Sequence, residues 1–147
     1  ALVEMLLSGG ASANLADAKG VSPLHVAAYQ GNAGIVQLLI DQRANVDVRD
    51  RHGQTPLFFA PSVEVCARLG AANADTNVLN HKGQSALHLA ARAGLDEVVA
   101  WLVERSNPGI LNVQDKHGRT ALYCAGASSS SGGASLRGTA ELLRKAE

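Results

Sequence analysis

Apolar residues recur along the chain in short blocks with helical spacing, and polar stretches separate the blocks. Ile35, Leu38 and Leu39 form one block, and Val98, Trp101 and Leu102 form another. Residues three and four positions apart lie on the same face of an α-helix. The pattern therefore predicts short amphipathic helices, each with one apolar face.

A short motif recurs ahead of these blocks. Gly-x-[Ser/Thr]-x-Leu occurs in "DAKGVSPLHVAAYQG", "DRHGQTPLFFA", "NHKGQSALHLAARAG" and "DKHGRTALYCA", which begin at Asp17, Asp50, Asn80 and Asp115. These starting positions are separated by 33, 30 and 35 residues. Self-similarity at a nearly fixed period is typical of proteins built from stacked repeats.

Local signals mark the first helix of each repeat. A hydroxyl that can cap the helix N-terminus is supplied by Ser22, Thr55, Ser85 and Thr120. Pro23 and Pro56 follow two of these residues, at the first helical position, where no backbone donor is lost. Gly31 and Gly94 are expected to end their helices, since glycine tolerates the left-handed conformation of a tight turn.

The repeats resemble ankyrin repeats over nearly the whole chain. The match is closest in "SPLHVAAYQGNAGIVQLLIDQRANVDV" (22–48) and in "SALHLAARAGLDEVVAWLVE" (85–104). The resemblance implies an all-α solenoid of stacked helix-turn-helix units with β-hairpin-like finger loops. It also implies that the module binds other proteins and has no catalytic activity.

We expect one domain over residues 1–147. Its parts are a partial repeat (1–16), three repeats (17–49, 50–79 and 80–114) and a C-terminal repeat (115–147) with a disordered Ser/Gly-rich insertion at 126–135. Leu2, Met5 and Leu6 have the spacing of a second helix whose first helix is absent. This start indicates a fragment of a longer protein.

Besides the C-terminal repeat with its insertion, two repeats depart from the pattern. The second repeat has a shortened turn at Pro61 and places Arg68 and Gly70 at positions that other repeats fill with Leu or Ile, so we expect it to be the weakest. The third repeat gains two residues, which we expect to form a loop between Arg105 and Val113. Such changes represent either tolerated loop variation or reshaping of one edge for a partner.

Composition limits the possible functions. Of the 147 residues, 46% are apolar and 3% aromatic, and 13 basic residues balance 13 acidic ones, so net charge predicts no attraction to nucleic acid or membranes. No apolar run is long enough to predict membrane insertion. Two cysteines without a CxxC pair favour an intracellular location, cytoplasmic or nuclear.

Candidate chemistry centres on His88. Its equivalents in the other repeats are His25, Phe58 and Tyr123, and no ligand or catalytic partner lies near it in the sequence. We therefore favour a structural hydrogen-bonding role, which the resemblance also implies, over metal binding or catalysis. No nucleotide-binding, zinc-protease or hydrolase motif occurs, so we expect no enzyme, no cofactor, no metal and no small-molecule substrate.

The remaining reactive or large side chains suit a core. Cys66 and Cys124 fall on apolar helices, which favours packing over a reactive thiol. Trp101 occupies a core position of its helix, and an exposed binding hot spot is the less favoured alternative.

The resemblance places partner contacts on the fingers and at the end of the first helix. Eight of the twelve finger positions are basic and none is acidic: Lys19, Arg51, His52, His81, Lys82, Lys116, His117 and Arg119. Tyr29, Gln30 and Arg92 lie at the ends of first helices. The pattern and the resemblance predict a monomeric module that binds a protein partner or peptide with an acidic surface through the basic finger loops and the concave helical face. A solvated charged rim is an equally weighted alternative, and nucleic-acid binding is a weaker one, because stacking aromatics are nearly absent.

Overall fold

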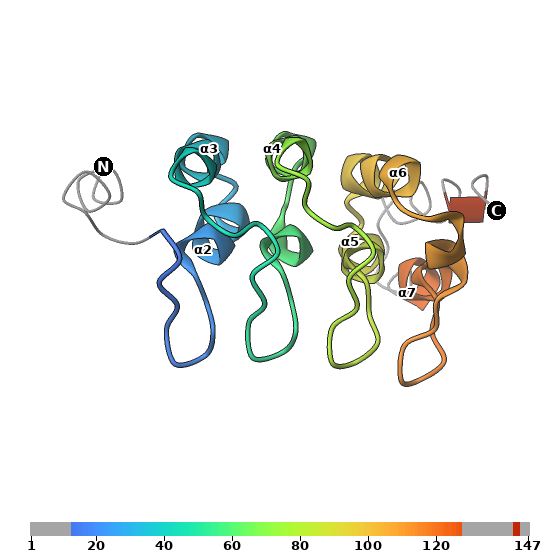
Figure 1. Ribbon diagram of the computed structural model, residues 1–147. Helices are drawn as coiled ribbons and strands as arrows, with labels where there is room; N and C mark the ends of the chain where they lie inside the picture. The colour runs from blue at the N-terminus through green and yellow to red at the C-terminus, as the bar shows by residue number, and fades with distance from the viewer. Residues whose placement is uncertain (1–12, 128–142, 145–147) are drawn as a thin grey trace. The chain divides into compact units, whose positions relative to one another are not determined.

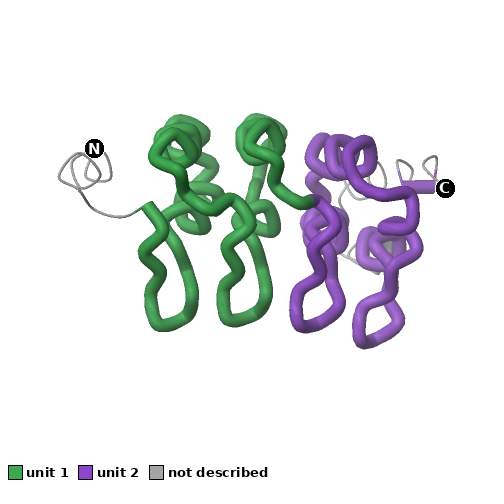
Figure 2. The backbone as a smooth tube through the Cα atoms, viewed as in Figure 1, with its two compact units in different colours: residues 1–75 green, residues 76–147 purple. Residues whose placement is uncertain are grey.

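The computed structural model describes residues 13–127 and 143–144, and the chain divides into two compact units. Unit 1 comprises residues 1–75 and unit 2 comprises residues 76–147 (Figure 2). Within each unit, pairs of short helices alternate with long loops that extend away from the helices as fingers (Figure 1). The described residues contain helices and turns and no strands, which confirms the all-α class.

Unit 1 holds four described helical elements. They are α2 (Pro23–Tyr29), α3 (Ala33–Asp41), the 3₁₀ helix η1 (Pro56–Phe59) and α4 (Val63–Ala71). α2 packs against both α3 and η1, and α3 packs against α4. The largest fully buried side chains of this core are Leu24, Val36, Leu39, Val65 and Leu69. Each leucine contributes roughly 2 kcal/mol through removal from water.

Unit 2 also contains a pair of helices followed by the first helix of the next repeat. Its elements are α5 (Ala86–Ala93), α6 (Asp96–Arg105), the 3₁₀ helix η2 (Pro108–Asn112) and α7 (Ala121–Ala127). α5 packs against α6 and α7. Ala90, Ala91, Ala121 and Ala125 are all buried, and such small side chains let neighbouring helices approach closely. Trp101 is buried as expected, and the Arg105 guanidinium lies 4.8 Å from its ring centroid.

The predicted helix signals are largely confirmed. The Ser22 hydroxyl accepts from the His25 N–H at 3.3 Å, and the Ser85 hydroxyl accepts from the His88 N–H at 3.4 Å. Gly31 and Gly94 adopt φ of 71° and 72°, as the end of a helix before a tight turn requires.

The expected cap at Thr55 is wrong. Its hydroxyl is buried and makes no hydrogen bond among the described residues. In the first and third repeats the capping serine hydroxyl also contacts a histidine Nδ1 at 2.9 Å. Phe58 takes the histidine position in the second repeat and has no such nitrogen, while its backbone N–H bonds to the Thr55 carbonyl at 3.0 Å.

We expect Thr55→Val to leave the chain equally stable or up to about 1 kcal/mol more stable, because the change removes a buried hydroxyl without a partner. The matched change Ser85→Ala is expected to cost about 1 kcal/mol, because it removes a functioning cap. Urea unfolding followed by circular dichroism measures both. If Thr55→Val lowers the free energy of unfolding as much as Ser85→Ala does, the conclusion that the Thr55 hydroxyl does not cap its helix is contradicted.

The second repeat differs from expectation in its second helix. α4 begins at Val63, after Ser62, whose hydroxyl accepts from the Val65 N–H. In this register Val65, Cys66 and Leu69 are the buried residues. Arg68 and Gly70 therefore lie outside the core, and the side chain of Arg68 is 43% exposed. The prediction that Arg68 and Gly70 occupy core positions is wrong, whereas the shortened turn at Pro61 is present between η1 and α4.

The extra residues of the third repeat form an ordered turn. We expected a loop between Arg105 and Val113, but η2 occupies much of it, and Ile110 and Leu111 are buried. The apolar pair explains the difference, since its burial fixes the turn. α7 includes the first two residues of the predicted insertion 126–135. The remainder of that insertion and residues 1–12 of the predicted partial repeat (1–16) lie outside the described residues.

Candidate partner-binding surface

Each finger is shaped by one side chain at its base. The side-chain oxygen of Asp17 accepts the backbone N–H groups of Lys19 and Val21, at 2.8 and 2.9 Å. Asp50, Asn80 and Asp115 each accept N–H groups two and four residues ahead in the same way. Aspartate and asparagine favour this local turn, which explains why the four repeats begin with these residues.

Within each unit, backbone and histidine contacts join one finger to the next. In unit 1 the Arg51 N–H donates to the Lys19 carbonyl at 2.8 Å, and the Lys116 N–H donates to the Lys82 carbonyl at 2.9 Å in unit 2. His25 Nε2 lies 2.8 Å from the Gln54 carbonyl oxygen. The two fingers of a unit are therefore held in a fixed mutual position.

His88 has the structural role expected of it. Its Nδ1 accepts the Ser85 backbone N–H at 3.2 Å, so Nε2 carries the proton and donates to the Arg119 carbonyl at 3.0 Å. Burial lowers the pKa of His88 and favours the neutral ring. Both ring nitrogens are engaged, and neither is available to a metal or substrate.

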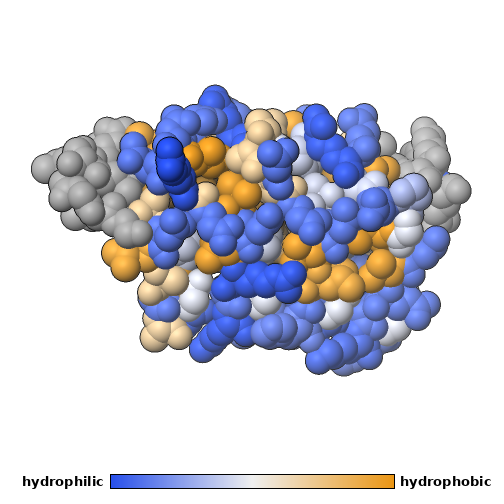
Figure 3. All heavy atoms as spheres, in the orientation of Figure 1, coloured by the Kyte–Doolittle hydropathy of each residue, from blue (hydrophilic) through white to orange (hydrophobic). Residues whose placement is uncertain are grey.

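The structure places most of the predicted contact residues at the surface. The exposed residues are Lys19, Arg51, His52, Tyr29 and Gln30 in unit 1, and His81, Lys82, Lys116, His117 and Arg92 in unit 2. On the face shown in Figure 3, hydrophilic residues cover much of the finger loops, and the first finger is paler than the others. Each unit thus brings two basic fingers side by side.

Arg119 differs from the other predicted contact residues. Its Nε and Nη2 both lie 2.9 Å from Oδ2 of Asp115, whose side chain is fully buried. Burial alone would raise the pKa of the Asp115 carboxyl, but the backbone N–H of Arg119, its guanidinium and the His117 N–H outweigh burial and hold this pKa well below its usual range. The guanidinium of Arg119 therefore stabilises its own finger.

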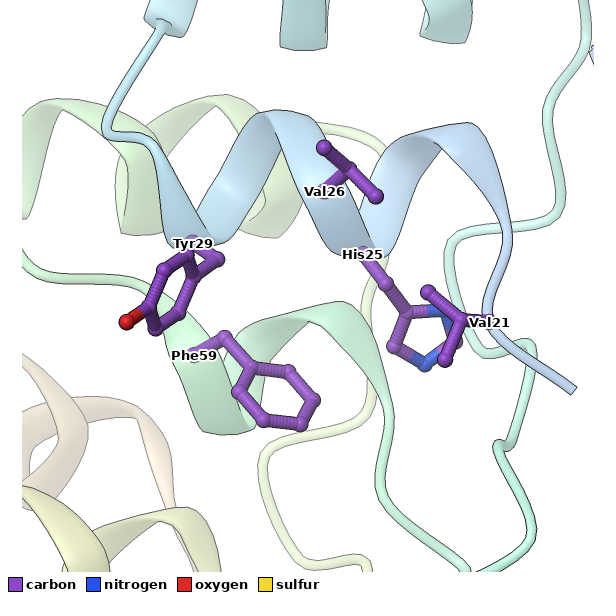
Figure 4. A pocket seen from close by; sticks show the side chains of 5 residues that line it. All are labelled: Val21, His25, Val26, Tyr29 and Phe59. Carbon is purple, nitrogen blue, oxygen red and sulfur yellow. The ribbon is translucent and has the colours of Figure 1, made fainter. Parts of the chain in front are cut away.

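Sequence reasoning missed an apolar pocket in unit 1. Val21, His25, Val26, Tyr29 and Phe59 line an open pocket of about 230 Å³ (Figure 4). Val26 is 45% exposed and Tyr29 is 72% exposed. The sequence did contain a signal for this pocket. In the first and second repeats an apolar residue, Val26 or Phe59, lies four positions after the predicted capping residue, and the aromatic Tyr29 ends the first helix of the first repeat.

The two cysteine thiols, of Cys66 and Cys124, are buried. Desolvation raises the pKa of the Cys66 thiol to about 12 and also raises the pKa of Cys124. Across residues 13–127 and 143–144, no three His, Cys, Asp or Glu side chains gather as a metal site requires.

The repeat geometry and the sequence agree with one family. A family profile described as Ankyrin repeats (3 copies) matches residues 1–69 and 60–136. The chain belongs to the ankyrin-repeat family. As such it is a repeat module of a kind that generally mediates protein–protein interaction and is generally not enzymatic.

Several curated relatives carry similar repeats. Human transient receptor potential cation channel subfamily A member 1 is 36% identical over 115 residues, which is 74% of this chain and 10% of the relative. Human neurogenic locus notch homolog protein 1 is 36% identical over 124 residues, or 82% of this chain and 5% of the relative. The E3 ubiquitin-protein ligase KEG of Arabidopsis thaliana is 32% identical over 127 residues, or 81% and 8%.

The chain thus spans a tenth or less of the length of these three relatives. Their names describe a channel, a notch homologue and a ligase, so the shared repeats do not select one activity. Each helix in the described part of the chain is too short or too polar to cross a bilayer.

Proposed function

We propose that this ankyrin module binds a partner protein that presents an acidic surface or an acidic peptide to the finger loops. One observation carries the proposal: the exposed finger tips are basic in both units, and no finger position of this set is acidic. Exposed basic residues at the finger tips add little to the stability of the fold. A partner with acidic side chains would gain association rate and specificity from them.

The test reverses three finger charges, Arg51→Glu, Lys82→Glu and Lys116→Glu. Lys116 is chosen in preference to Arg119, since a glutamate at 119 would face the buried Asp115 carboxylate. Partners are captured from lysate with the original chain, and their association rates are then measured by biolayer interferometry over a range of salt. We expect association to slow by about tenfold or more, with a flatter salt dependence.

A matched control reverses Arg43, Arg49 and Arg144, which are exposed and lie outside the finger tips. It changes the net charge by the same amount. If both triple variants slow association equally, the effect belongs to net charge and the fingers are not the site. An unchanged rate in the finger variant identifies the basic tips as a solvated rim.

Nucleic-acid binding through the same fingers is the alternative. If the fingers contacted DNA phosphates, the chain would bind random duplex DNA, and the affinity would fall steeply with salt concentration. Tyr29 is the one Phe, Tyr or Trp residue among the predicted contact residues, so stacking would contribute little. We expect no binding to random duplex even at low salt, and fluorescence anisotropy with a labelled duplex measures it.

We also propose that the module has no catalytic activity of its own. The support is chemical: the ring nitrogens of His25 and His88 are engaged in structural hydrogen bonds. The thiol of Cys66 is held protonated by burial. These groups therefore do not provide a base or a nucleophile.

A further inference from the structure

The apolar pocket of unit 1 offers a partner a surface without polar groups. His25 contributes only ring carbons, because its Nδ1 accepts the Ser22 N–H and its Nε2 bonds to the Gln54 carbonyl. The ring packs edge-on against Phe59, with 5.8 Å between centroids and 68° between planes. In Figure 4 the Tyr29 hydroxyl points away from the other four side chains. The pocket therefore favours an uncharged, apolar group.

The short first element of the second repeat opens this pocket. η1 spans four residues where α2 spans seven, and Ala60 and Pro61 then lead directly to α4. No further helical turn follows Phe59 to cover Tyr29. The result is an exposed valine and tyrosine beside a half-buried phenylalanine, within one unit.

Basic side chains lie on the two fingers that adjoin the pocket. Val21, which lines the pocket, is two residues from Lys19, and the first finger is bonded through Lys19 to Arg51 of the second. The carboxylates of Asp17 and Asp50 at the finger bases each accept two backbone N–H groups. Lys19, Arg51 and His52 are left exposed at the tips.

We propose that the pocket anchors one apolar side chain, aliphatic or aromatic, of an extended acidic peptide segment of the partner. This inference rests on the proposed function and specifies the partner for the same surface. The pocket, at about 230 Å³, is smaller than the roughly 300–1,000 Å³ of typical small-molecule sites and lacks a polar group to orient a cofactor. In a two-fold symmetric contact a second copy of the chain would bring basic fingers against basic fingers. An extended peptide advances about 3.3 Å per residue, so carboxylates within about three residues of the anchor can reach the finger tips.

The test uses a displayed library of random 12-residue peptides, selected on the 147-residue chain and counter-selected on its Val26→Gln variant. This substitution keeps the charge and fills the pocket mouth with a polar amide. We expect the selected peptides to share one apolar residue with Asp or Glu within three positions of it. Fluorescence anisotropy then measures synthetic peptides of the selected sequences.

In these measurements Val26→Gln and replacement of the peptide's apolar residue by serine should each weaken binding about tenfold or more. The two changes combined should cost little more than either alone, because they remove the same contact. Leu15→Gln is the matched control, since Leu15 is 63% exposed and lies outside the pocket. It should leave the affinity unchanged, and thermal melting verifies that all variants fold.

Three outcomes would overturn the inference. If the selected peptides are acidic, lack an apolar residue and bind the Val26→Gln variant as tightly as the original chain, the pocket anchors no side chain. The proposed function would remain intact. If the selected peptides are apolar without a preference for Asp or Glu, and Arg51→Glu does not change their affinity, the partner is not acidic. This result would contradict the proposed function as well. A selection that yields no peptide able to distinguish the original chain from Val26→Gln would show that the pocket anchors nothing.

Discussion

Gly20→Ala is expected to lower the free energy of unfolding by about 3 kcal/mol, because two costs add at this position. Gly20 has φ of 75°, in the left-handed region, where a residue with a Cβ loses about 1–2 kcal/mol. A Cβ there would also lie 3.0 Å from Cα of Asp50 and 3.2 Å from N of Arg51, both on the backbone of the next finger. That finger must shift to admit it.

The other fingers provide a graded control. Gly118 has the same φ of 75°, yet a Cβ added there would meet no described atom within 4 Å beyond its chain neighbours, so Gly118→Ala should cost only the conformational term, about 1–2 kcal/mol. A Cβ at Gly83, 3.4 Å from Cα of Asp115, should give a cost between the two. Urea unfolding gives the three values. Amide exchange at Arg51, whose N–H bonds to the Lys19 carbonyl, should accelerate only in Gly20→Ala. Equal losses at Gly20 and Gly118 would show that the close approach of the fingers carries no cost.

His88→Phe is expected to cost about 2 kcal/mol at pH 7. Phenylalanine preserves the ring and occupies the equivalent position, Phe58, in the second repeat. It cannot accept the Ser85 N–H or donate to the Arg119 carbonyl, and both of these groups would lose a partner. Chemical denaturation at pH 7 measures the loss.

The same variant should change how stability depends on pH. Burial lowers the pKa of His88 in the folded chain, whereas the unfolded chain takes up the proton at the ordinary value of 6.5. Stability therefore falls as pH decreases below about 6.5, by at most about 1.4 kcal/mol per pH unit from this group. His88→Phe lacks this proton uptake, so its deficit should shrink between pH 7 and pH 5.

Tyr123→Phe is the control for His88→Phe, since Tyr123 holds the same repeat position but is 58% exposed. It should change stability by less than about 0.5 kcal/mol and leave the pH dependence unaltered. A deficit of His88→Phe that stays constant from pH 7 to pH 5 would contradict the assignment of a neutral, buried His88.

The sequence by itself determined the features that arise from neighbours within about four residues. The capping serines, Ser22 and Ser85, and the turns at Asp17 and Asp115 depend on side chains that bond to nearby backbone N–H groups. Helical spacing of apolar residues predicted the buried face of α6, with Val98, Trp101 and Leu102, for the same reason. Recurrence of these local signals at a period near 33 residues was sufficient to predict the repeat fold.

Only the tertiary structure decided features that depend on residues from adjacent repeats or on the register of a helix. Thr55 has the sequence of a cap, but the replacement of histidine by Phe58 and the 3₁₀ geometry of η1 leave its hydroxyl without a partner. Arg119 has the sequence of a contact residue, but the burial of Asp115 engages it in its own finger. The pocket of unit 1 exists because η1 ends early beside Tyr29, and such a juxtaposition arises only when neighbouring repeats pack together.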